Sequence, residues 1–129
     1  MNKVKRKILV VDDDENICEL FNDFLKREGH EPTTVKDGAD AFYHAQKSQW
    51  DLVFLDLSLP VLNGWDIIKR LREIQPGIKV VITTGLPCEE EIRKVGEEKG
   101  AIDFLQKPFL LNQITEVINK HCQSSNITQ

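Results

Sequence analysis

Long apolar segments are absent from this sequence of 129 residues. No run approaches the roughly 20 apolar residues that a membrane-spanning helix needs. The basic N-terminus is followed only by the short apolar run at residues 8–11, which is too short for the core of a signal peptide. The sequence therefore predicts a cytoplasmic protein that makes no contact with a membrane.

Cysteine is scarce, and positive charge is not in excess. The cysteines, Cys18, Cys88 and Cys122, lie far apart without C-x-x-C spacing, so we expect free buried thiols and no zinc or redox site. The sequence has 17 Lys and Arg against 21 Asp and Glu, which gives a net charge of −4. We expect no direct nucleic-acid binding, because that function needs a basic face.

Linkers, low-complexity segments and sequence repeats are also missing, and the length fits one domain. What the chain does contain is a regular alternation of short apolar runs with amphipathic segments. We expect strands at residues 8–11, 33–35, 52–55, 79–83 and 102–105. We expect helices at residues 17–25, 41–45, 67–74, 89–99 and 111–122.

This alternation predicts an α/β fold, with a parallel sheet between two layers of helices. Five strand–helix units favour a doubly wound, flavodoxin-like sheet of strand order 2-1-3-4-5. We expect the domain to span residues 7–122, with an N-terminal extension at 1–6 and a polar C-terminal tail at 123–129. In such sheets the functional site lies at the carboxyl ends of the strands.

Chemically active side chains gather at those strand ends. They are Asp12, Asp13 and Asp14 after the first strand, Asp56 after the third, Thr84 after the fourth, and Lys107 and Pro108 after the fifth. In the predicted strand order the third strand lies between the first and the fourth, so these ends converge. We therefore expect one site that contains carboxylates, a hydroxyl and an ammonium group.

The charges of this site limit the ligands and the chemistry that it can support. Asp12, Asp13 and Asp56 would repel one another unless a cation were bound, and an oxygen-only ligand set suits Mg²⁺. A carboxylate beside Mg²⁺ can attack phosphorus and form an acyl phosphate. Lys107 and Thr84 would then supply a positive charge and a hydrogen-bond donor to the phosphoryl oxygens.

Simpler interpretations of the same residues are available. Asp14 is a good N-cap for the first helix, and Asp12 and Asp13 could share that role. Asp56 alone would be a turn residue, and Lys107 alone would be a solvated charge. Three acids are more than one helix cap needs, and the four strand ends coincide, so the site is favoured.

Four segments resemble the receiver domain of two-component response regulators. They are ILVVDDDENI (8–17), DLVFLDLSLPVLNG (51–64), VVITTG (80–85) and DFLQKPF (103–109). The resemblance covers residues 7 to about 122. It implies that Asp56 accepts a phosphoryl group. It also implies that Mg²⁺ binds directly to Asp13, Asp56 and the backbone carbonyl of Ser58, and through water to Asp12.

The resemblance assigns further roles near the fourth and fifth strands. Thr84 would hydrogen-bond the phosphoryl group and Lys107 would pair with it, with a cis peptide bond between Lys107 and Pro108. Phe104 occupies the position of a rotameric switch, although it could equally be an ordinary core residue. The family more often has Tyr at this position, and it often has a polar N-cap where this chain has Leu110.

The resemblance implies a phosphorylation switch that catalyses only its own phosphorylation and dephosphorylation. A sensor histidine kinase or a histidine phosphotransfer protein would donate the phosphoryl group. Phe104 would then turn inward and remodel the face formed by the fourth helix, fifth strand and fifth helix, to which an unknown downstream protein would bind. A phosphorylation-dependent dimer is left open. Met1 and the short tail favour a free-standing receiver over one excised from a longer regulator or hybrid kinase.

Two other functions use similar residues. A phosphatase of the haloacid dehalogenase type shares the Asp nucleophile, Mg²⁺ and Lys, but it carries a second acid where this chain has Ser58, and its cap domain has no room here. A degenerate receiver would only bind partners, which the complete acidic, Thr and Lys set disfavours. Nucleotide binding is disfavoured because neither a Walker A nor a G-x-G-x-x-G pattern occurs.

Overall fold

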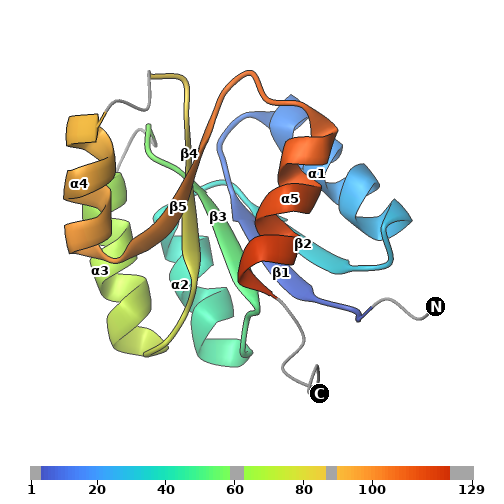
Figure 1. Ribbon diagram of the computed structural model, residues 1–129. Coiled ribbons are helices and arrows are strands. Elements are labelled where there is room, and N and C mark those ends of the chain that lie inside the picture. Colours follow the sequence, from blue (N-terminus) through green and yellow to red (C-terminus); the bar gives the residue numbers. More distant parts are fainter. Residues whose placement is uncertain (1–3, 59–62, 87–89, 123–129) are drawn as a thin grey trace, which may run out of the picture.

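The computed structural model describes residues 4–58, 63–86 and 90–122, in which strands and helices alternate (Figure 1). The strands are β1 (Lys7–Val11), β2 (Glu31–Val35), β3 (Leu52–Asp56), β4 (Val80–Thr84) and β5 (Ala101–Gln106). The helices are α1 (Glu15–Arg27), α2 (Gly38–Lys47), α3 (Gly64–Ile74), α4 (Glu90–Lys99) and α5 (Leu111–His121). The strands pair in parallel in the order β2-β1-β3-β4-β5, which confirms the predicted fold and topology.

Most elements are longer than their apolar patterns indicate, and β2 and α2 show the reasons. Strand β2 begins at Glu31, and Val35 is the only one of its residues that is buried, because β2 is an edge strand. Helix α2 begins at Gly38, because the Asp37 side chain accepts a hydrogen bond from the Asp40 amide and caps a polar first turn. The polar tail predicted at 123–129 lies outside the described residues.

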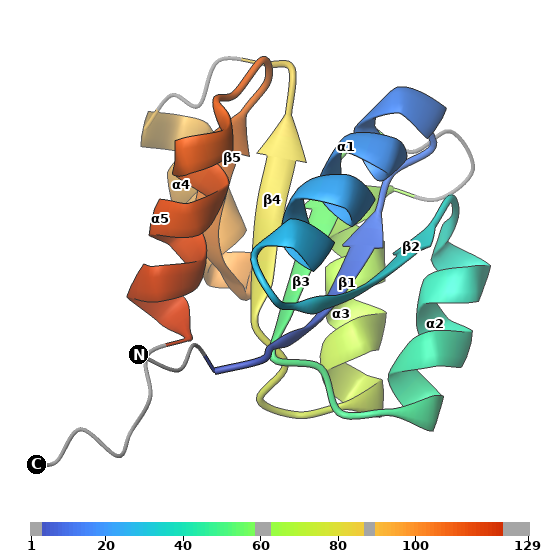
Figure 2. The ribbon, with the colours of Figure 1, turned by 90° about the vertical axis from the view of Figure 1, so that its right-hand side faces the viewer.

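Helices cover both faces of the sheet. Helices α1 and α5 lie on one face, and α2, α3 and α4 lie on the other (Figures 1 and 2). Successive strand residues point to opposite faces, so Ile8 and Val10 pack in the layer of α1 and α5, whereas Leu9 and Val11 pack in the opposite layer. Both faces of β1, β3 and β4 are therefore apolar, and the buried polar side chains of these strands lie at their carboxyl ends.

The strand order reverses between β1 and β3, which are neighbours in the sheet but not in the chain. In this register Val11 pairs with Leu55, and Asp56 pairs with Thr83 of β4. Asp12 therefore leaves β1 beside the last residue of β3. A crevice at the carboxyl ends of the strands, at the point where the order reverses, is the usual site of doubly wound sheets.

Two sequence predictions about cysteines and membranes bear on this fold. Cys18 and Cys122 are buried free thiols, as predicted, and Cys88 lies outside the described residues. Burial raises the pKa of both thiols, which keeps them protonated at neutral pH.

Within the described ranges, no helix is long and apolar enough to cross a membrane.

Candidate functional site

The three acids after β1 have different environments. Asp14 is the N-cap of α1, and its side chain accepts a hydrogen bond from the Asn16 amide at 2.9 Å, which confirms its predicted capping role. Asp12 is 1% exposed, and its Oδ1 accepts from the Asp14 amide at 2.9 Å. Asp13 is exposed. Asp14 alone caps the helix, so the carboxylates of Asp12 and Asp13 remain available for a site.

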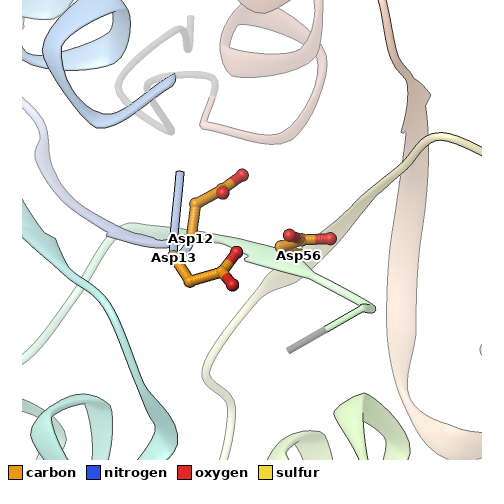
Figure 3. A group of neighbouring side chains, drawn as sticks. All are labelled: Asp12, Asp13 and Asp56. Atoms are coloured by element: carbon orange, nitrogen blue, oxygen red, sulfur yellow. The ribbon is translucent and has the colours of Figure 1, made fainter. Parts of the chain in front are cut away.

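Asp56 completes an acidic cluster at this edge of the sheet. It ends β3 with 5% exposure, and its Oδ1 accepts a hydrogen bond from the Ser58 amide at 3.0 Å. One carboxylate oxygen from each of Asp12, Asp13 and Asp56 lies within 4.8 Å of the others. Figure 3 shows Asp12 and Asp13 approaching from the end of β1 and Asp56 from the end of β3. The predicted convergence of these three residues is confirmed.

Lys107 reaches the same cluster from the segment that follows β5. Its ammonium nitrogen lies 2.8 Å from Asp12 Oδ2 and 3.4 Å from Asp56 Oδ2. The Lys107 amide donates to the carbonyl of Thr84 at 2.7 Å, and the bond from Lys107 to Pro108 is cis, as predicted. The hydrogen bond to Thr84 fixes the backbone of Lys107, and the ammonium group is directed toward the carboxylates.

Burial and charge shift the proton affinities of this pair. Burial raises the pKa of Asp12 above its usual value, and the hydrogen bond from Lys107 offsets this only in part. Burial alone would lower the pKa of Lys107, but its hydrogen bond to Asp12 and the charges of Asp12 and Asp56 raise it above its usual value. Lys107 is therefore a firmly protonated cation, and the cluster still carries unneutralised negative charge.

Thr84 and Phe104 lie on the β4 and β5 side of the site. Thr84 is fully buried at the end of β4, and its Oγ1 accepts a hydrogen bond from the Leu86 amide at 3.1 Å. Phe104 pairs with Ile82 across β4 and β5 and is 7% exposed. The ring is already buried, as the core interpretation expects. The switch role of Phe104 stays a prediction.

The sequence does not predict the contact between Cys18 and the site. The Cys18 thiol donates a hydrogen bond to the backbone carbonyl of Asp12 at 3.1 Å. This contact connects the first turn of α1 to the residue that carries the buried carboxylate. The sequence shows Cys18 only as an apolar position of the helix, so no pattern in it indicates this bond.

The sequence matches the family model described as "Response regulator receiver domain" over residues 8–119. The chain belongs to this family. Among curated receiver proteins, sporulation initiation phosphotransferase F of Bacillus subtilis is 32% identical over 118 residues. That match covers 92% of this chain and 94% of the relative. The transcriptional regulatory protein PhoP of the same organism, named for alkaline phosphatase synthesis, is 35% identical over 125 residues. The match covers 96% of this chain but 51% of PhoP.

Solved structures agree with this assignment. The chemotaxis protein CheY4 of Vibrio cholerae superposes with a TM-score of 0.85 at 27% identity, over 92% of this chain and 99% of CheY4. NtrX of Brucella abortus superposes with a TM-score of 0.86 at 30% identity, over 96% of this chain and 28% of NtrX. The receiver chain spans about half the length of several curated relatives, which include DNA-binding response regulators.

Proposed function

We propose that this receiver domain accepts a phosphoryl group on Asp56 in a Mg²⁺-dependent reaction, and that phosphorylation changes how the domain binds a partner. The observation that carries the proposal is the junction of two buried carboxylates, Asp12 and Asp56, with the ammonium group of Lys107. This arrangement offers a nucleophile, a set of oxygen ligands for a cation, and a fixed positive charge for an incoming anion.

The residues present fit Mg²⁺. They offer only oxygen ligands, their carboxylate oxygens lie within 4.8 Å of one another, and one ammonium group does not neutralise three carboxylates. Asp13, Asp56 and the carbonyl of Ser58 would bind the ion directly, and Asp12 would act through water. The ion would neutralise charge on the carboxylates and on the phosphoryl oxygens, which otherwise repel each other.

Asp56 is the best placed nucleophile. Its Oδ1 is held by the Ser58 amide at 3.0 Å, and its Oδ2 lies 3.4 Å from the Lys107 ammonium group. A carboxylate oxygen attacks the phosphorus of a phosphohistidine, the P–N bond breaks, and its electron pair stays on the imidazole nitrogen, which then takes up a proton. The product is an acyl phosphate on Asp56. Lys107 then pairs with the phosphoryl oxygens, and the Thr84 hydroxyl donates a hydrogen bond to them.

The partners follow from this chemistry. The donor is a sensor histidine kinase or a histidine phosphotransfer protein in the cytoplasm, and the response is read on the face of α4, β5 and α5. The likeness to sporulation initiation phosphotransferase F over 94% of that protein supports a role in phosphoryl transfer. Several relatives are named as DNA-binding regulators, and this chain spans about half their length. We propose that residues 7–122 act through proteins and not through direct contact with nucleic acid.

Intact mass spectrometry tests the proposed reaction. After incubation with acetyl phosphate and Mg²⁺, the wild-type protein should gain the mass of one phosphoryl group, and the gain should disappear in Asp56→Asn. Asp23→Asn on the exposed surface of α1 is the matched control and should be phosphorylated like the wild type. Equal phosphorylation of Asp56→Asn, or equal phosphorylation in excess chelator, contradicts the proposal.

A further inference from the structure

The Phe104 ring lies directly against the backbone of α4. A Cβ atom placed on Gly96 would lie 2.2 Å from Phe104 Cζ and 2.9 Å from Cε2, far inside contact distance. Gly96 is the only buried residue of α4, in which Ile92 is half-buried and the other residues are exposed. The helix therefore has a notch at Gly96, formed by the missing side chain, and the tip of the Phe104 ring fills it.

A second residue of α4 holds the same ring. The guanidinium carbon of Arg93 lies 5.4 Å from the centroid of Phe104, at a distance where a cation attracts an aromatic face. Arg93 and Gly96 are three residues apart and so lie on one side of the helix. The ring is thus packed between the helix backbone at its tip and a cation over its face, which explains its 7% exposure.

The identity of residue 104 matters for this packing. Phenylalanine carries no hydroxyl, so its burial leaves no polar atom in need of a partner. A tyrosine at this position would carry its oxygen on Cζ, the ring atom nearest to the notch. The hydroxyl would then need space that the α4 backbone at Gly96 occupies. Phe104 and Gly96 are therefore a complementary pair of residues on β5 and α4.

We propose that Gly96 holds the Phe104 ring in the notch of α4 both before and after phosphorylation of Asp56. This inference rests on the proposed phosphoacceptor function. The Phe104 ring then stays packed against α4, so that α4 and β5 move together. The ring does not rotate between an outer and an inner position. In this proposal α4 and β5 rearrange as a unit on phosphorylation. The prediction that Phe104 turns inward is the alternative outcome, in which the ring leaves Gly96.

The connection from the site to this unit runs through Thr84. The Thr84 hydroxyl contacts the Leu86 amide at 3.1 Å, in the segment that leads from β4 toward α4. Thr84 also pairs with Gln106 in β5, two residues beyond Phe104. A movement of Thr84 toward a phosphoryl group would therefore be transmitted to both elements that hold the ring.

A double-mutant cycle on the unphosphorylated protein tests the notch. In the wild type, Gly96→Ala should lower Tm, because the new methyl group displaces the ring. In the Phe104→Leu background, the same change should raise the equilibrium constant for folding about fivefold, which is the ordinary helix propensity gain of Ala over Gly. Val95→Ala, on the exposed side of α4, should give the same shift in both backgrounds. The notch is overturned if Gly96→Ala has the same effect in both backgrounds.

NMR tests the claim that the ring stays in place. A nuclear Overhauser effect between the Phe104 ring and the Gly96 α protons should be present in the free protein. It should persist when Asp56 is phosphorylated or carries beryllofluoride with Mg²⁺. Loss of the contact on phosphorylation overturns the proposal. Failure of the protein to gain phosphoryl mass overturns the proposed function instead, and the thermal cycle then still decides whether the notch exists.

Discussion

Lys107 donates a hydrogen bond of 2.8 Å to Asp12, although 95 residues separate them along the chain. The contact joins the segment after β5 to the segment after β1, at the two sides of the acidic cluster. It gives the buried Asp12 carboxylate a cation before any metal binds. The contact therefore offsets part of the cost of burying the Asp12 carboxylate, and it also places the charge that an incoming phosphoryl group needs.

Removal of this ammonium group should cost stability when Mg²⁺ is absent. We expect Lys107→Met to lower the free energy of unfolding by about 1–3 kcal/mol in chelator, because Asp12 and Asp56 lose their buried partner. Saturating Mg²⁺ should restore more stability to the variant than to the wild type. Chemical denaturation with and without Mg²⁺ measures both effects. Lys94→Met, on the exposed surface of α4, should change little. An equal loss in both variants would contradict this role for Lys107.

The raised pKa of Asp12 predicts a pH dependence. The metal-free folded protein binds the Asp12 proton more tightly than the unfolded chain, whose pKa is near 3.8. This contribution to stability is therefore present at low pH and is lost as pH rises through the raised pKa. Asn resembles protonated Asp, so Asp12→Asn should be more stable than wild type at about pH 7 and should match it near pH 3. Thermal unfolding in chelator measures this difference, and a variant less stable at neutral pH would refute the prediction.

Gly64 should tolerate no side chain. A Cβ atom at this position would lie 2.7 Å from Leu57 Cδ1 and 3.0 Å from the Leu57 backbone, directly after Asp56. We expect Gly64→Ala to lower the free energy of unfolding by about 1–3 kcal/mol and to slow phosphorylation, because the Leu57 backbone must shift. Gly85→Ala is the control, since a Cβ there meets no atom within 4 Å. Equal thermal stability of the two variants would show that the contact is relaxed at little cost.

A buried glutamine holds the opposite end of the domain. Gln75 accepts a hydrogen bond from the Trp50 amide at 2.9 Å and donates to the carbonyls of Ala45 and Ser48 at 3.0 and 2.7 Å. We expect Gln75→Leu to lower the free energy of unfolding by about 2–4 kcal/mol, because buried backbone groups lose their partners. Gln46→Leu, at an exposed position of α2, should leave the free energy of unfolding nearly unchanged. Phosphorylation of Asp56 should persist in folded Gln75→Leu, because this cluster is remote from the acidic site.

The sequence predicts most of the fold, because its strands are short, continuous and apolar. The residues of β1, β3 and β4 are almost all buried, and the acids lie at the ends of β1 and β3. Strand β2 was predicted too short, because an edge strand need not be apolar. The convergence of Asp12, Asp13 and Asp56 follows from strand order alone, since parallel strands end at one edge.

The sequence does not predict which side chains pack against one another between helices and strands. The hydrogen bond from Cys18 to the Asp12 carbonyl and the contact of Phe104 with Gly96 depend on how helices sit on the sheet. Gly96 interrupts a polar helix in the sequence, where it indicates only a weaker helix. The structure shows its role, because the absence of a side chain at Gly96 leaves space for the Phe104 ring of β5.

Mapping of the phosphorylated residue tests the central claim most directly. The protein is phosphorylated with acetyl phosphate and Mg²⁺, the acyl phosphate is reduced with borohydride, and the reduced residue is located by tandem mass spectrometry. The account predicts reduction of the Asp56 side chain alone, with none in excess chelator. A reduced residue at Asp12 or Asp13, or an acyl phosphate that forms equally well without Mg²⁺, would contradict it.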